Sequence, residues 1–175
     1  MVKYADSPST EVEVSIDAPP ASVWPFLCDI NVPGQFSEEF IRAEWIDEGP
    51  AVGATFRGYN RHELVGEWNL VCTVTACVDQ ERFEWTIGDV DFKVARWRFD
   101  LEPTESGSTL KFSAEMGPAP SGLTPAIKSM PDKEEEIVAG RLAEWTDNMR
   151  RTVEGIKGLA EGCLLYTSPS PRDRG

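Results

Sequence analysis

Histidine and basic residues are scarce in this chain of 175 residues. It contains one histidine, 17 lysines and arginines, and 30 aspartates and glutamates, which give a formal net charge of −13 at pH 7. A single histidine excludes metal sites built from two or three histidines. The acidic excess argues against nucleic acid and against anionic membrane surfaces, because both need clustered Lys and Arg. We therefore expect no nucleic-acid partner.

Long apolar segments and metal-type cysteine spacings are also lacking. No stretch is long enough to span a bilayer, and no apolar run follows the first ten residues. We therefore expect no membrane insertion, no signal peptide and a cytoplasmic location. Cys72 and Cys77, two of four cysteines, are five apart in one predicted strand and should face opposite sides of it. Buried free thiols, rather than a metal site or a disulfide, are the expectation.

The common catalytic and nucleotide-binding motifs do not occur. There is no Gly-x-Ser-x-Gly elbow, no His-Glu zinc-protease motif, no Walker loop and no Gly-rich dinucleotide fingerprint. The sequence therefore indicates no cofactor and no metal, and no protein partner is evident from it.

The clearest pattern present is a helical stripe between Asp132 and Ala160. Its apolar residues recur at steps of three and four, at Val138, Leu142, Trp145, Met149, Val153, Ile156 and Leu159. Asp132 is the expected N-cap, with Glu135 three residues later. The charged residues between the stripe positions, among them Arg141 and Glu144, are expected to be solvated. Too little else is helical to bury this stripe, so the helix must lie on a sheet.

Seven segments have the alternation that is typical of strands. They are Glu11–Ile16, Ile41–Asp47, Thr55–His62, Gly66–Val78, Arg82–Ile87, Val94–Glu102 and Thr109–Met116. Two short helices are expected after the first strand, one through Val23 and Leu27 and one starting after Asn31 and carrying Phe36 and Phe40. Residues Gly117–Pro131 have no long periodic run and are a candidate lid.

The chain length favours a single domain with a real core, which we place at residues 1–162. Residues Cys163–Gly175 lack periodicity and resemble a translated sequencing-adapter read-through. We expect this tail to be disordered and non-native.

Several segments resemble one family. Val52–Arg61 resembles the GxxFxGxN strand of the polyketide cyclase/dehydrase branch of the START/Bet v 1-like (SRPBCC) superfamily, and Arg96–Pro103 and Ser121–Pro125 resemble later parts of it. The resemblance covers about Val12 to Glu161. It implies an α+β helix-grip fold, in which a curved seven-stranded antiparallel sheet wraps round a long C-terminal helix. Members include carriers, cyclases and dehydratases, so the resemblance does not specify an activity.

In such a fold, a cavity remains between the sheet and the helix. The inward positions that we expect to bind ligand are Phe56, Asn60, Trp68, Leu70, Trp85, Trp97, Phe99, Met116, Leu142, Trp145 and Met149. The alternative is that these rings simply fill the core. The Asn60 amide shares the face of Phe56, so it should bond a backbone group, water, or a ligand carbonyl or hydroxyl.

The register of the Thr55–His62 strand decides which polar side chains face the cavity. His62 lies on the same face of the strand as Asn60, but it is near the strand end, where we expect it to be exposed at a turn. If the register shifts by one residue, Arg57, Tyr59 and Arg61 face inward instead. A tyrosine beside two arginines could polarise a carbonyl for cyclisation.

Two functions follow from these patterns. The first is binding, without catalysis, of a small hydrophobic or aromatic ligand, polyketide-like or lipid-like, in the cavity. The alternative is a polyketide cyclase- or dehydratase-like enzyme that uses the same cavity and needs a convergent acid/base pair there. No residue can be assigned a catalytic role from the sequence.

Overall fold

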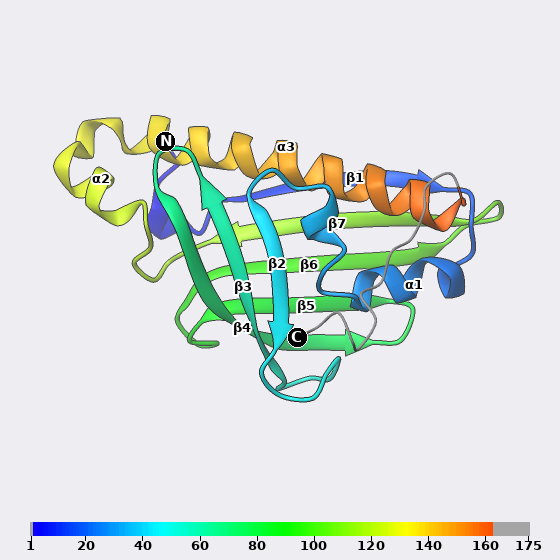
Figure 1. Cartoon of the computed structure of the whole chain (residues 1–175). Coiled ribbons are helices and arrows are strands. Elements are labelled where there is room, and N and C mark those ends of the chain that lie inside the picture. Colours follow the sequence, from blue (N-terminus) through cyan, green and yellow to red (C-terminus); the bar gives the residue numbers. More distant parts are fainter. Residues whose placement is uncertain (1, 163–175) are drawn as a thin grey trace.

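A strongly curved sheet and one long helix make up the computed structural model, which describes residues 2–162 (Figure 1). The predicted tail, Cys163–Gly175, lies outside the described residues. The strands are β1 (Ser9–Ile16), β2 (Phe40–Trp45), β3 (Thr55–His62), β4 (Gly66–Val78), β5 (Arg82–Gly88), β6 (Lys93–Pro103) and β7 (Ser108–Met116). They are antiparallel throughout, in the order β1-β7-β6-β5-β4-β3-β2. The predicted helix-grip sheet is confirmed.

Three α-helices and three 3₁₀ turns accompany the sheet. The helices are α1 (Pro20–Cys28), α2 (Thr124–Ser129) and α3 (Glu134–Ala160), and the turns are η1 (Tyr4–Asp6), η2 (Pro33–Gln35) and η3 (Pro131–Lys133). Figure 1 shows α3 lying along the concave side of the sheet, with α1 near its C-terminal half and α2 beyond its N-terminal end. Within residues 2–162, no helix is long and apolar enough to cross a membrane.

Burial along α3 follows the predicted stripe. Six of its seven positions are buried, and Leu142 is half-buried. The predicted N-cap is wrong, because Asp132 lies inside the η3 turn and the α-helix begins at Glu134 without a side-chain cap. The fixed φ of Pro131 suits the first position of this tight turn. Three glutamates in the first turn of α3 interact favourably with the helix dipole instead.

The second predicted short helix is reduced to the η2 turn, and Phe40 starts β2. The Ser37 hydroxyl accepts hydrogen bonds from the backbone N–H groups of Glu39 and Phe40, which satisfies donors that a helix would have used. Gly34 lies so close to β2 that an added Cβ would stand 2.3 Å from the Ile41 carbonyl oxygen. The chain therefore leaves the turn directly into the edge strand.

The free edge of β2 is capped by one side chain. The Asn31 amide oxygen accepts a hydrogen bond from the Ala43 N–H at 2.9 Å, and its NH₂ donates to the Ala43 carbonyl at 3.1 Å. Asn31 thereby replaces the neighbouring strand that an edge strand lacks.

Replacement of Asn31 by alanine should lower the free energy of unfolding by about 1–2 kcal/mol, because it leaves two backbone groups of a residue that is 7% exposed without partners. Chemical denaturation measures this loss. Asn31→Asp, which keeps only the acceptor, should fall between wild type and alanine. Equal stability of all three proteins would contradict the capping role.

A β-bulge corrects the expectation for the cysteines. The register of β4 against β5 shifts between Val74 and Ala76, so the alternation of side chains reverses there. Cys72 pairs with Ile87 and Cys77 with Phe83, which places both thiols on the helix-facing side. Both are free, as is Cys28, so the expected free thiols are confirmed for these three residues.

Candidate functional site

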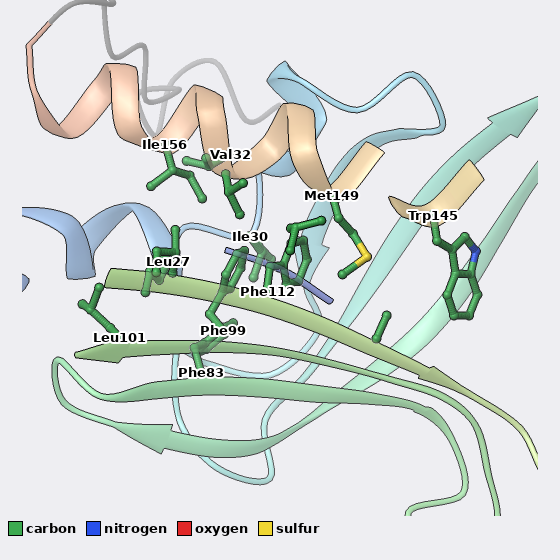
Figure 2. Close-up of a cluster of buried hydrophobic side chains, with 14 of the residues drawn as sticks. Leu27, Ile30, Val32, Phe83, Phe99, Leu101, Phe112, Trp145, Met149 and Ile156 are labelled. Atoms are coloured by element: carbon green, nitrogen blue, oxygen red, sulfur yellow. The ribbon is translucent and has the colours of Figure 1, made fainter. Parts of the chain in front are cut away.

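The space between sheet and helix differs along the length of α3. Near the C-terminal half, where α1 also packs, the apolar side chains are completely buried; they include Leu27, Phe83, Phe99, Val153 and Ile156. In Figure 2, Leu27, Phe83, Phe99 and Ile156 lie together beneath α3, whereas Trp145 stands apart from them. This half is filled by the protein itself.

Next to the N-terminal half of α3, Val138 and Trp145 are buried, but several other inward side chains are only partly buried. Trp85, Ile87 and Trp97 belong to the interior strands β5 and β6, and Leu142 belongs to the buried stripe of α3. Since both neighbours of an interior strand are present, solvent reaches these side chains only from the concave side. We call the partly exposed apolar surface that Trp85, Trp97 and Leu142 form beside Trp145 the N-terminal hollow.

Aromatic contacts form the wall of the N-terminal hollow. The ring of Trp97 lies 4.7 Å from that of Trp145, and Trp85 lies 6.1 Å from Phe56. The tilted and edge-on geometries are those that aromatic pairs prefer. The wall can therefore offer ring faces and edges to a planar ligand.

The expected ligand-binding residues fall into two groups. Those that are half-buried are Asn60, Trp68, Leu70, Trp85, Trp97 and Leu142, and those that are buried are Phe56, Phe99, Met116, Trp145 and Met149. Phe99 stacks on Phe112 at 4.0 Å, and it lies with Met149 in the filled half. Contact of any of these side chains with a ligand remains a prediction.

The register of β3 is the one first expected. Phe56 and Gly58 are buried, while Arg57 and Tyr59 lie on the convex face. There Arg57 donates a hydrogen bond to the side-chain amide oxygen Oδ1 of Asn69 at 2.7 Å, and the Arg42 guanidinium lies 3.8 Å from the Tyr59 ring centroid. The alternative, with Arg57, Tyr59 and Arg61 facing the helix, is wrong.

Asn60 lies between Phe40 on β2 and Trp68 on β4. It is half-exposed, and its amide has no hydrogen-bond partner within residues 2–162. Of the three expected kinds of partner, a backbone group is not found within residues 2–162, and water and a ligand remain. This amide is available to a ligand at the edge of the hollow.

The expectation that His62 is exposed at a turn is wrong, because its side chain reaches across to α3. Its side chain is 21% exposed, and its Nε2 lies 2.6 Å from a Glu144 carboxylate oxygen. The Leu64 backbone N–H donates to Nδ1 at 3.1 Å. Because Nδ1 is an acceptor, Nε2 carries the proton and donates it to Glu144. Both ring nitrogens are engaged, so neither is free to act as a general base.

Two further side chains complete this cluster, which we call the rim cluster: Glu39, His62, Arg141 and Glu144. The two terminal nitrogens of Arg141 donate to the two carboxylate oxygens of Glu39 at 2.6 and 2.8 Å, and Nη1 is also 3.3 Å from Glu144. Arg141 and Glu39 are both largely buried, so the pair is well shielded from solvent. The rim cluster ties the start of β2 and the end of β3 to α3.

The rim cluster does not suit a metal ion. Ligand atoms of Glu39, His62 and Glu144 lie within 4.8 Å of one another. A metal on Nε2 would require a proton on Nδ1, which already faces the Leu64 N–H. In addition, the Arg141 guanidinium already supplies the positive charge between the two carboxylates.

Cysteine chemistry is disfavoured as well. Burial raises the pKa of Cys28 and of Cys72 to about 12, so both thiols are protonated near neutral pH. A protonated thiol is a poor nucleophile.

Within the Gly117–Pro131 segment, Thr124–Ser129 forms α2, and Leu123 and Ile127 pack against the core. Its role as a lid remains a prediction.

Known proteins resemble this chain in sequence and fold. A family model described as "Polyketide cyclase / dehydrase and lipid transport" matches residues 7–154. The solution structure of the Polyketide_cyc-like protein Cgl2372 from Corynebacterium glutamicum is 30% identical, with a TM-score of 0.62 over 89% of this chain and 92% of that one. No curated protein matches the sequence significantly.

Two more distant structures show the fold alone. The di-domain ARO/CYC protein BexL from the BE-7585A biosynthetic pathway is 16% identical, with a TM-score of 0.70 over 90% of this chain and 51% of that one. Ara h 8.0201 is 14% identical, with a TM-score of 0.54 over 89% of this chain and 96% of that one.

Proposed function

Because the chain belongs to the polyketide cyclase/dehydrase and lipid transport family, we propose that it binds a small, mainly apolar, ring-containing molecule in the N-terminal hollow. The observation that carries this proposal is the partial exposure of Trp85 and Trp97 on interior strands. Both indoles pack against the core and still reach solvent, whereas Phe83 and Phe99 beneath the C-terminal half of α3 are 1% exposed. Indole rings suit planar or lipid-like guests. The protein would act in the cytoplasm.

Binding without turnover is favoured over catalysis. A cyclase or dehydratase needs an acid and a base that converge on the bound substrate. His62 has both nitrogens engaged, and Arg57 and Tyr59 lie on the convex face. The Asn60 amide can hold a ligand but cannot take up a proton. Mass spectrometry of a candidate polyketide before and after incubation tests this choice, since conversion would establish an enzyme.

Filling the hollow should weaken binding. Leu142→Trp adds a large ring at a half-buried position that faces the hollow, and the dissociation constant for 2-naphthylmethanol should rise more than about tenfold, the effect of losing ~1.4 kcal/mol. Isothermal titration calorimetry measures it. The control is Ala143→Trp, which adds the same ring at the next, exposed position and should bind as wild type does. Equal binding by both variants would place the ligand elsewhere.

Asn60 should matter only to ligands that can bond its amide. Asn60→Leu should weaken a carbonyl-bearing ligand such as 2-acetylnaphthalene about five- to thirtyfold, equivalent to ~1–2 kcal/mol. The hydrocarbon 2-ethylnaphthalene should bind both proteins alike. If both ligands weaken equally, Asn60 is a structural residue and not an anchor.

A further inference from the structure

The charged groups beside the N-terminal hollow belong to the rim cluster. The rim cluster holds two carboxylates, Glu39 and Glu144, and one guanidinium, Arg141. The His62 Nδ1 accepts the Leu64 N–H and its Nε2 donates to Glu144, which is the hydrogen-bond pattern of an uncharged imidazole. One positive charge therefore faces two negative charges. The rim carries a formal charge of −1.

The rim cluster adjoins the hollow through one indole ring. The Arg141 guanidinium lies 5.8 Å from the Trp145 ring centroid, and Trp145 is in contact with Trp97. A charged group on a ligand that contacts Trp97 or Trp145 is therefore close to the charged side chains of the rim cluster. At that distance, and in a partly buried setting, the sign of the charge affects affinity.

Arg141 cannot serve as an anchor for an anion in this arrangement. Both of its terminal nitrogens already bind the two oxygens of Glu39, and Nη1 is also close to Glu144. A ligand carboxylate would have to displace Glu39 and would leave that half-buried carboxylate unpaired. The faces of the surrounding indoles, moreover, carry negative potential, which attracts cations and repels anions.

We propose that the N-terminal hollow selects neutral or cationic aromatic molecules and rejects those that carry a carboxylate, sulfonate or phosphate. This inference rests on the proposed function and specifies the ligand class of the same site. It also explains why the rim pairs its arginine so completely with Glu39 and Glu144. An unpaired arginine in that place would attract acidic ligands.

Three probes of matched shape test the selection: 2-naphthylmethylamine, 2-naphthylmethanol and 2-naphthoate. Calorimetric titrations are done in 0.3 M NaCl, where the contribution of the distant surface charges is largely screened. We expect the cation to bind at least about tenfold more tightly than the anion, with the alcohol between them. Equal or tighter binding of 2-naphthoate would overturn the inference. Failure of the neutral alcohol to bind would instead overturn the proposed function itself.

Removing the two rim carboxylates should reverse the order. The variant Glu39→Gln with Glu144→Gln leaves Arg141 unpaired, so the rim becomes positive and 2-naphthoate should bind more tightly than the amine. The matched control, Asp147→Asn with Glu154→Gln, makes the same change in net charge at exposed positions of α3 and should keep the wild-type order. Reversal in the control as well would mean that overall charge, not the rim, sets the preference.

A single variant keeps the test informative if the double variant fails to fold. Glu144→Gln makes the rim neutral, so the ratio of the two dissociation constants should move towards one. A ratio that stays at the wild-type value in folded Glu144→Gln protein would contradict a role for the rim.

Discussion

Val153→Asp should remove most of the protein's stability at 25 °C. Val153 is 0% exposed and lies on the α3 stripe that faces the sheet. An aspartate there is surrounded by apolar groups and has no cation to pair with, so the loss of stability should exceed ~4 kcal/mol, a large part of what a domain of this size has. Circular dichroism and chemical denaturation provide the readout.

The control for this substitution is Ala143→Asp. It adds the same single negative charge to the same helix, but at an exposed position, and should cost less than about 1 kcal/mol, mainly through helix propensity. If the two variants denature at similar denaturant concentrations, the helix does not pack on the sheet through the stripe described above.

Leucine substitutions at two glycines of α3 should act in opposite directions. At Gly155 an added Cβ would lie 2.4 Å from the Phe36 ring, so Gly155→Leu forces that ring or the helix to move and should cost about 3 kcal/mol. At Gly140 nothing lies within 4 Å of such a Cβ, and Gly140→Leu should stabilise the helix by about 0.5–1 kcal/mol. Thermal or denaturant unfolding of both variants measures the two shifts.

Phe36 explains why the first of these effects should be large. It precedes β2 and is held between η2 and α3, so its ring has little freedom to move away. A double variant, Gly155→Leu with Phe36→Ala, should recover part of the lost stability, because the ring that clashes is gone. No recovery would mean that the cost at Gly155 arises from another contact.

The helix and most strands can be predicted from the sequence because the spacing of their apolar residues matches the side chains that are buried. The α3 stripe and the alternation of β6 follow from side chains that face one apolar layer. Local exceptions do not leave such a trace. The bulge at Val74–Ala76, which turns Cys77 inward, and the Ser37 hydrogen bonds that end the η2 turn depend on backbone geometry that the hydrophobic pattern does not encode.

The candidate site could be predicted only in part. The alternation along a strand identifies which aromatic residues face the helix, but it does not distinguish how deeply they are buried. Phe99 and Trp97 lie on the same face of β6, yet Phe99 is 1% exposed and Trp97 is half-buried. The difference arises because α1 fills only one end of the space beneath α3. The rim cluster joins Glu39, His62 and α3 across more than 80 positions of sequence, and nothing local to either segment signals that pairing.

The most direct test of ligand binding in the N-terminal hollow is a titration with 2-naphthylmethanol. Nuclear magnetic resonance follows the indole N–H signals of the six tryptophans during this titration. If the ligand occupies the N-terminal hollow, the signals of Trp85, Trp97 and Trp145 should shift together and saturate with one dissociation constant. The signal of Trp24, which lies on α1, should not move. Saturation that affects Trp24 and leaves Trp97 and Trp145 unchanged, or no saturable shift of any indole, would contradict the hollow as the binding site.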